Sequence, residues 1–276
     1  MAVLLEIEDG DPWWSSPNVW TVPGDDPQGP PGLPIAGKQC YLWARVRNTG
    51  QDGVTNATVR FYWANPSVGF DRTTANPVGT AFVALTGGQT ADALCLTPWT
   101  PVYVNEGHEC ILAEAFEPLL DPLAAVAAFN VPTDRHVAQR NLSVVMQLSG
   151  QSFHLAFEVD NPTRRARVFS LSVKEAKLTR LENLLPLLGR SFELPQRAGR
   201  AQACGFVTSP CPDSRAVERA VPRIENAESG PHERRGYSLV GRLEGPAALL
   251  EITQEVDGRV AGGLSALVVR AREEAT

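Results

Sequence analysis

Two runs within residues 38–64 constrain the fold of this chain more than any other stretch, because every second residue in them is apolar. In the first run these residues are Cys40, Leu42, Ala44 and Val46, and in the second they are Val59, Phe61 and Trp63. A period of two places each set on one face of a β-strand. A strand pair cannot bury such a face alone, so a second sheet must cover it, which predicts a β-sandwich.

Strand-like segments recur along the rest of the chain. Further strands are predicted at 80–85, 91–96, 108–116, 141–148, 152–159, 167–174 and 237–243. The last segment is predicted to be a hairpin, since Asp257-Gly258 favours a tight turn between two apolar runs. Two helices are predicted, a short Ala-rich one at 121–129 and one at 176–188, where leucines recur at helical spacing before Gly189.

A change in composition near residue 135 divides the chain. All six tryptophans lie at or before Trp99, and the later part is richer in arginine. We therefore expect an all-β protein of two tandem β-sandwich domains, an immunoglobulin-like one over 38–135 and a divergent one with one short helix over 136–276. The Pro-rich and Gly-rich residues 1–37 are expected to form an arm packed on the first domain, and 195–235 a long mobile loop.

Charge and hydropathy disfavour binding to nucleic acid and a membrane span. The formal net charge is −6, whereas a nucleic-acid binder needs a basic face. No apolar run approaches the roughly 20 residues that cross a bilayer. The start, MAVLLEIEDGDPWW, lacks the basic region of a secretory signal peptide. We expect cytoplasmic synthesis without a signal peptide, and signal-independent export stays open as an alternative.

No catalytic motif is found in the sequence. The HExxH, GxSxG, GxGxxG and complete P-loop patterns are absent, and the four histidines form no pair at i and i+4. The five cysteines form no CxxC motif and match no metal-binding spacing. We therefore expect no metal, no cofactor and no enzymatic activity. A hydrolase with dispersed catalytic residues, for example Cys204 with His232, is the less favoured alternative.

Cys40 and Cys110 are predicted to lie on two core strands, with Trp63 between them in the sequence. One interpretation is a disulfide that joins the two sheets, as in immunoglobulin domains. The favoured interpretation is a pair of buried free thiols, because disulfides are uncommon in the cytoplasm.

The aromatic residues of the first half are the candidate binding residues. They are too many for the centre of one small core, and Trp and Tyr are typical of binding surfaces. The candidates are Trp13, Trp14, Trp20, Trp43, Tyr62 and Trp99. The alternative is that the tryptophans of the arm only cover the outer face of a sheet. Two arginine-rich runs, at 164–167 and 234–235, are candidates for binding phosphate or an acidic partner, or else they simply solvate loops.

The stretch WARVRNTGQDGVTNATVRFYWA resembles the bacterial CARDB-type immunoglobulin-like module. The shared pattern is a strand that ends in V-x-N-x-G, followed by an Ala/Thr-rich strand start. It comprises Val46, Asn48, Gly50, Ala57, Val59, Phe61 and Tyr62. The segments DPWWSSPNVW, GHECILAEA and DRHVAQRNLSVV extend the resemblance over residues 10–148, and FEVDNPTRRARVFSLSV matches it loosely at Val159, Asn161 and Val168.

The resemblance implies a seven-stranded sandwich used in adhesion, display or assembly, without catalytic residues. We therefore expect a non-enzymatic binding or assembly module that contacts another protein, as an accessory or structural subunit of a larger bacterial assembly. The contact would use the Trp-rich face or an exposed edge strand. The alternative is a carbohydrate-binding module with exposed tryptophans. Coplanar Trp rings that face solvent would favour sugar binding, and rings buried under the arm would favour a structural role.

Overall fold

The chain forms two compact units in a computed structural model. The first unit comprises Met1–Ala64, Phe70–Asn141 and Asn183–Phe192, and the second comprises Asn65–Gly69, Leu142–Glu182 and Glu193–Thr276. The structure describes residues 2–64, 72–73, 75–102, 110–125, 129–147, 152–161, 163–189, 198–209, 212–213 and 215–270. Nearly all regular structure in these ranges is β-strand, which confirms the predicted all-β class.

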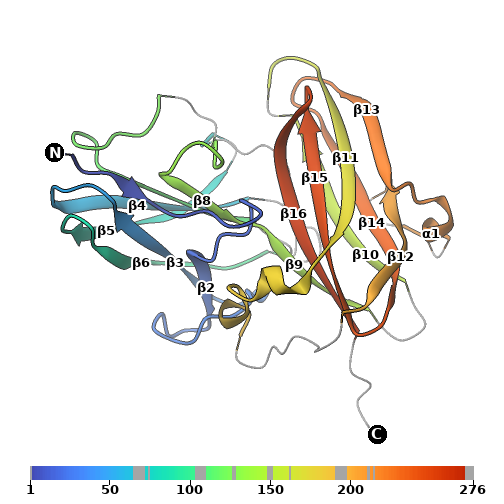
Figure 1. The fold of residues 1–276 in the computed structure, drawn as a ribbon, viewed down its shortest axis with the longest axis horizontal. Coiled ribbons are helices and arrows are strands. Elements are labelled where there is room, and N and C mark those ends of the chain that lie inside the picture. The colour runs from blue at the N-terminus through green and yellow to red at the C-terminus, as the bar shows by residue number, and fades with distance from the viewer. Residues whose placement is uncertain are drawn as a thin grey trace, which may run out of the picture. The chain divides into compact units, whose positions relative to one another are not determined.

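The first unit is a sandwich of two antiparallel sheets (Figure 1). In one sheet, β3 (Cys40–Asn48) pairs with β6 (Thr90–Trp99) on one edge, and with β1 (Leu5–Glu6) and β2 (Val19–Pro23) on the other. We call it the β3 sheet. The other, the β4 sheet, has the order β5 (Asn76–Leu85), β4 (Val54–Ala64), β7 (Cys110–Phe116) and β8 (Val137–Arg140).

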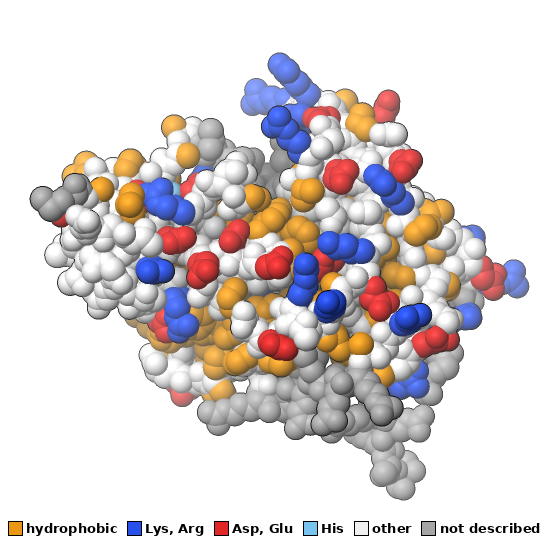
Figure 2. Space-filling view, viewed as in Figure 1, with side chains coloured by type: hydrophobic (Ala, Val, Ile, Leu, Met, Phe, Trp, Pro, Cys, Tyr) orange, Lys and Arg blue, Asp and Glu red, His pale blue; other side chains and the backbone are white. Residues whose placement is uncertain are grey.

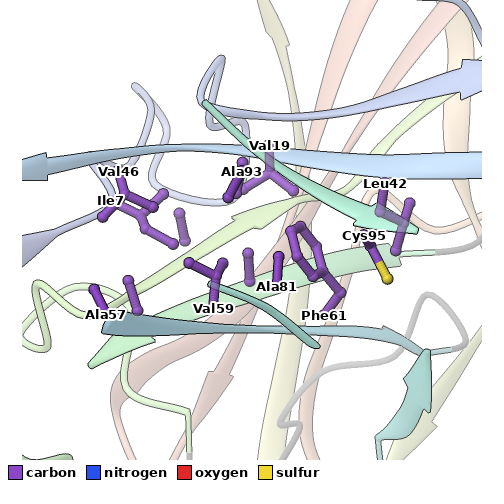
Figure 3. Packing of buried hydrophobic residues seen from close by; sticks show 14 of the residues in the cluster. Ile7, Val19, Leu42, Val46, Ala57, Val59, Phe61, Ala81, Ala93 and Cys95 are labelled. Atoms are coloured by element: carbon purple, nitrogen blue, oxygen red, sulfur yellow. The ribbon is translucent and has the colours of Figure 1, made fainter. Parts of the chain in front are cut away.

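The core of the first unit lies between the predicted faces of β3 and β4. Leu42 and Val46 of β3 are fully buried, as are Val59 and Phe61 of β4 (Figure 3). Trp63 packs against the same cluster while remaining partly exposed. The period-two prediction for residues 38–64 is therefore confirmed.

The arm expected over residues 1–37 is largely part of the sandwich. It supplies the strands β1 and β2, and Ile7 and Val19 enter the core. Farther along, Ser15 bridges Arg140, and the backbone N–H of Ser16 donates to the carbonyl of Gln139 at 2.9 Å. The arm therefore covers the outer edge of β8, which would otherwise expose unpaired backbone groups.

The second unit is also a sandwich. The β14 sheet has the order β10 (Phe153–Asp160), β14 (Arg234–Glu244) and β12 (Arg200–Val207). The β15 sheet has the order β13 (Arg223–Ser229), β11 (Arg167–Ala176), β15 (Ala247–Val256), β16 (Arg259–Arg270) and β9 (Leu142–Gln147), with β9 parallel to β16. The predicted hairpin at Asp257-Gly258 joins β15 to β16.

Two predicted helices are wrong in the described residues. The expected helix at 176–188 is the end of β11 followed by two 3-10 turns, η2 (Leu178–Leu181) and η3 (Leu185–Leu187). Pro186 explains the difference, since it has no N–H to donate inside an α-helix. The described part of the expected helix at 121–129 is not helical, and residues 126–128 lie outside the described ranges. The first two residues of the strand expected at 108–116 also lie outside these ranges.

The long loop expected over 195–235 is mostly regular structure. Its described residues form β12, the short helix α1 (Ala216–Arg219), β13 and the start of β14. Both strands are held by distant partners, because β12 pairs with β14 and β13 pairs with β11. Their sequences are rich in charged and small residues, so pairing with distant strands stabilises them more than local propensity does.

The two units share one strand order. The pair β3–β6 corresponds to β10–β14, and the run β5–β4–β7–β8 corresponds to β13–β11–β15–β16. The second unit differs by the insertion of β12 between β11 and β13, and by β9, which lies beside β16. The second unit is thus a divergent copy of the same immunoglobulin-like topology.

A buried asparagine occupies the same corner of both units. In the first, Asn48 at the end of β3 accepts from the backbone N–H groups of Leu4 and Gly50 and donates to the carbonyls of Asp52 and Thr86, at 2.8 to 3.3 Å. It thereby joins the connection between β3 and β4 to the turn between β5 and β6.

In the second unit Asn161 follows β10 and makes the equivalent bonds. Its Nδ2 donates to the carbonyls of Arg165 and Gly230 at 2.8 Å each, and of Ser229 at 3.1 Å. Its Oδ1 accepts from the backbone N–H and the hydroxyl of Thr163. Both asparagines belong to the V-x-N pattern in the sequence, so that pattern marks a structural corner.

Candidate functional site

The aromatic residues predicted to bind a partner do not form one surface. Trp20 and Trp43 stack on the outer face of the β3 sheet, with ring centroids 5.8 Å apart and planes 8° apart. The arm partly covers this pair, because the indole N–H of Trp43 donates to the carbonyl of Pro27 at 3.0 Å. Leu187 packs there as well, and Trp20 is buried.

The other tryptophans lie elsewhere in the first unit. Trp99 is buried in the core, where its ring stacks on that of Trp63. Trp14 is buried beside β8, since its carbonyl accepts from the N–H of Asn141, and Trp13 packs edge-on against it. Of the five predicted tryptophans, only Trp13 and Trp43 are half-buried, and the rest are buried.

Tyr62 belongs to a buried polar cluster on the outer face of the β4 sheet. Its hydroxyl donates to Oε1 of Glu114 at 2.7 Å, and Nε of Arg72 donates to Oε2 at 2.7 Å. The side chain of Glu114 has no exposed surface. Burial, with a contribution from Glu114, raises the pKa of Tyr62 to about 12. These contacts give Tyr62 a structural role.

Replacing Tyr62 with Phe is expected to make stability less sensitive to alkaline pH. The pKa of Tyr62 is raised in the folded state. The stabilisation that the protonated hydroxyl gives the folded state is therefore complete below the pKa of the unfolded state, and it is lost as pH rises toward about 12. Between about pH 9 and about pH 11, wild type should lose about 1 kcal/mol more than the variant. Urea unfolding at both pH values measures the difference, and equal losses would contradict the raised pKa.

The cysteines form no disulfide in the described residues, where Cys40, Cys95, Cys110 and Cys204 are free thiols. Cys40 faces the core, whereas Cys110 lies on the outer face of the β4 sheet beside Tyr62 and Leu112. Because side chains alternate along β7, Cys110 points away from Cys40. The structure therefore has Cys40 and Cys110 as buried thiols on different faces, where they are not placed to form an inter-sheet disulfide.

Cys204 and His232 are not brought together. Cys204 lies on β12 beside Gly241, whereas His232 precedes the opposite end of β14. A strand rises about 3.4 Å per residue, so roughly 24 Å separates Gly241 from Arg234, and His232 lies two residues beyond Arg234. Burial also raises the pKa of the Cys204 thiol to about 12, which is the reverse of what a nucleophile needs. In the described ranges, no group of three or more His, Cys, Asp or Glu is placed to hold a metal ion.

A shallow polar groove of about 250 Å³ lies on the first unit. It is lined by Glu6, Glu8, Asn18, Arg45, Arg47 and Thr90. Arg45 is engaged by Asp92 through two hydrogen bonds of 2.7 and 3.0 Å, and it also lies over the Trp20 ring. The groove therefore offers a surface of mixed charge.

Among the large apolar side chains of the described residues, the most exposed one, Leu119, belongs to the turn after β7. Leu119 and Leu120 are 88% and 57% exposed. Their neighbours Pro118, Pro122, Ala124 and Ala125 are exposed too. We call residues 118–125 the apolar turn. An exposed apolar group of this kind is typical of an interaction site.

Hydrogen bonds hold the base of the apolar turn. The carboxylate of Glu117 accepts from the backbone N–H groups of Leu119 and Leu120 at 2.7 and 2.5 Å. Glu117 and Asp121 also exchange backbone hydrogen bonds of 3.0 and 3.1 Å across the turn. The two leucines therefore project from a fixed backbone.

A buried cluster behind the turn anchors it to the sandwich. Oδ2 of Asp121 accepts from the N–H of Leu5 at 2.6 Å, and Oδ1 pairs with Arg135. The imidazole of His136 lies between two carboxylates, with Nδ1 2.7 Å from Asp134 and Nε2 3.2 Å from Asp121. Both His136 and Asp121 are buried. The turn is thus joined to β1 and to the residues before β8.

The sequence prediction missed this turn because it assigned the Ala-rich segment 121–129 to a helix. The available signal was Pro118-Leu-Leu-Asp-Pro122, in which two prolines bracket two leucines. Prolines at this spacing favour a turn over a helix.

No protein-family model and no curated protein sequence matches the chain. Among solved structures it is similar to the CARDB domain of the PF1109 protein from Pyrococcus furiosus in complex with di-metal ions, with 19% identity and a TM-score of 0.29, over 50% of this chain and 85% of that one. It is also similar to red sea bream transglutaminase, with 10% identity and a TM-score of 0.25, over 93% of this chain and 32% of that one.

A third similar structure is the CupB6 tip adhesin from Pseudomonas aeruginosa, with 10% identity and a TM-score of 0.25, over 99% of this chain and 98% of that one. These likenesses extend no further than the all-β fold. The strand order shows the immunoglobulin-like topology, whereas the relation to CARDB modules remains a resemblance. Of the helices in the described ranges, none has the length and apolar character of a membrane span.

Proposed function

We propose that this chain is a non-enzymatic binding or assembly module that contacts another protein through the apolar turn. The observation that carries the proposal is the exposure of Leu119 and Leu120 on a turn whose base is held by the carboxylates of Glu117 and Asp121. Neither leucine contributes to the core of the unit, so folding does not explain why they are apolar.

The geometry of the turn suits a partner with an apolar pocket. Full burial of a leucine side chain contributes about 1.5 to 3 kcal/mol. The hydrogen bonds of Glu117 and Asp121 order the backbone before binding, which lowers the entropic cost of forming a complex. Two neighbouring leucines on a rigid turn are therefore able to act as the centre of an interface.

The tryptophans support a structural role more than a sugar-binding one. The coplanar pair Trp20 and Trp43 has the geometry of a sugar platform, but Trp20 is buried and Trp43 is bonded to the arm. We therefore assign the contact to the apolar turn and not to the Trp-rich face.

Replacing Leu119 and Leu120 with Ser is expected to lower partner recovery at least about tenfold, because about 1.4 kcal/mol of lost apolar burial has that effect. The measurement is affinity purification of the tagged protein from its native cell, with quantitative mass spectrometry of wild type against variant. Both side chains are exposed, so the melting temperature should hardly change.

The matched control is Phe82→Ser with Leu96→Ser, which removes two other exposed apolar side chains from the first unit. It should leave recovery unchanged. Equal recovery with wild type and the Leu119/Leu120 variant would contradict the proposal, as would the absence of any stoichiometric partner.

A further inference from the structure

Two arginine runs that are about 70 residues apart in sequence meet at one end of the second unit. Arg164 and Arg165 lie in the connection between β10 and β11, and Arg234 begins β14. Asp160, which ends β10, is paired with Arg234, so the connection and the start of β14 lie together. The N–H of His232 also donates to the carbonyl of Thr163 at 3.1 Å.

A further arginine, Arg259, shares this end. It begins β16 directly after the turn at Asp257, whose N–H donates to the carbonyl of Val168 near the start of β11. We call Arg164, Arg165, Arg234 and Arg259 the arginine end. All four side chains are exposed. Figure 2 shows Lys and Arg side chains gathered over this end of the second unit.

The carboxylates next to the arginine end already have partners. Glu233 binds Arg235 at 2.5 Å and accepts from the N–H of Gly230, and Asp257 pairs with Arg167. Among the described residues, Arg164, Arg165 and Arg259 have no carboxylate within ion-pair distance. Their guanidinium groups are therefore available to an external anion.

The backbone that carries these arginines is held in place. Nδ2 of Asn161 donates to the carbonyl of Arg165 at 2.8 Å. The main-chain carbonyl of Arg165 is thus hydrogen-bonded to the buried Asn161, while the side chain of Arg165 is exposed to solvent. A pre-ordered backbone lowers the entropic cost of binding.

The first unit shows that the corner itself needs no arginine. The equivalent connection after Asn48 is Thr49-Gly50-Gln51-Asp52, and it makes the same type of hydrogen bonds to its asparagine. Two copies of one corner therefore share the asparagine and differ in the arginines. The fold explains the shared asparagine, but it does not explain the arginines, which indicates that they have another role.

We infer that the arginine end binds an acidic segment of a partner protein. Guanidinium groups form bidentate hydrogen bonds with carboxylates, and a few of them gathered at one end of a unit suit a short run of Glu or Asp. Nucleic acid is disfavoured, since it requires a more extended basic face and the chain carries a net charge of −6. The inference extends the proposed binding role to a second surface and a second chemistry.

The test is fluorescence anisotropy with the full chain and a labelled peptide of about twelve Glu and Asp residues, titrated at low salt and at about 0.15 M salt. We expect saturable binding that weakens with salt. Arg164→Ala with Arg165→Ala should weaken binding at least about tenfold, because two charge-assisted contacts are lost. The control Arg200→Ala with Arg242→Ala, which removes two exposed arginines from the β14 sheet, should change it less than about twofold.

The inference is overturned if the peptide does not bind at low salt, if both double variants weaken it equally, or if a single-stranded oligonucleotide of equal length binds more tightly. The Leu119/Leu120 variant should bind the peptide like wild type. Failure of this inference and failure of the proposed contact through the apolar turn are therefore distinguishable.

Discussion

Replacing Asn48 with Ala is expected to lower the free energy of unfolding of the first unit by about 3 kcal/mol. The substitution leaves the N–H groups of Leu4 and Gly50 and the carbonyls of Asp52 and Thr86 without their partner. Each buried polar group left unpaired costs about 1 to 3 kcal/mol, and relaxation with water recovers part of the sum. Chemical denaturation, followed by tryptophan fluorescence, measures the loss, since all six tryptophans lie in the first half.

Asn161→Ala should produce a loss of similar size in the second unit, because that side chain makes five equivalent bonds. The matched control is Asn18→Ala, in which a more exposed asparagine loses one bond of 3.2 Å to the carbonyl of Glu8. Its effect should stay below about 1 kcal/mol. A loss at Asn48 no larger than that at Asn18 would show that the corner does not stabilise the unit.

Replacing Arg72 with Met is expected to destabilise the first unit by about 3 kcal/mol. Glu114 has no exposed surface, and Arg72 is its strongest cationic partner, since Arg60 lies 3.7 Å away. Removing one member of a buried pair leaves a charge without compensation, which typically costs about 3 to 5 kcal/mol. Urea denaturation at neutral pH measures the difference.

Two controls sharpen this prediction. Arg45→Met removes an arginine whose ion pair with Asp92 has the same 2.7 Å distance but is exposed, so it should cost less than about 1 kcal/mol. Adding Glu114→Leu to Arg72→Met should recover part of the lost stability, because the uncompensated carboxylate is removed. If Arg72→Met and Arg45→Met have the same effect, the cluster is not a buried ion pair in solution.

The features that the sequence predicted correctly are those with a local cause. The alternation in residues 38–64 gives the two inner faces of β3 and β4, because side chains alternate along any strand. The V-x-N pattern, noticed through a family resemblance, marks Asn48 and Asn161, although its hydrogen bonds to distant turns follow only from the fold.

The features that the sequence did not predict depend on distant partners. β12 and β13 exist because β14 and β11 pair with them, and no local pattern of residues 195–235 records that pairing. The relation of Cys110 to Cys40 depends on which face of β7 is inward, and apolar residues occupy both faces of this strand.

The candidate site was predicted poorly for a similar reason. Composition indicated that the tryptophans are too numerous for the core. It did not indicate that the arm and Leu187 cover the surface around Trp20. The exposure of the two leucines in the apolar turn depends on Glu117 and Asp121, which fix the backbone of the turn and anchor it to the sandwich. Exposure of apolar residues is a property of the folded unit and has no signature in local sequence.

The most direct test of the proposed contact is photo-crosslinking from position 119. A benzophenone side chain in place of Leu119, irradiated in extract from the native cell, should form an adduct with one partner protein. The same group in place of Val221, an exposed residue of the second unit outside the arginine end, should not. Such a result would place a partner on the apolar turn. Absence of an adduct at position 119, or the same adducts from both positions, would contradict a specific contact there.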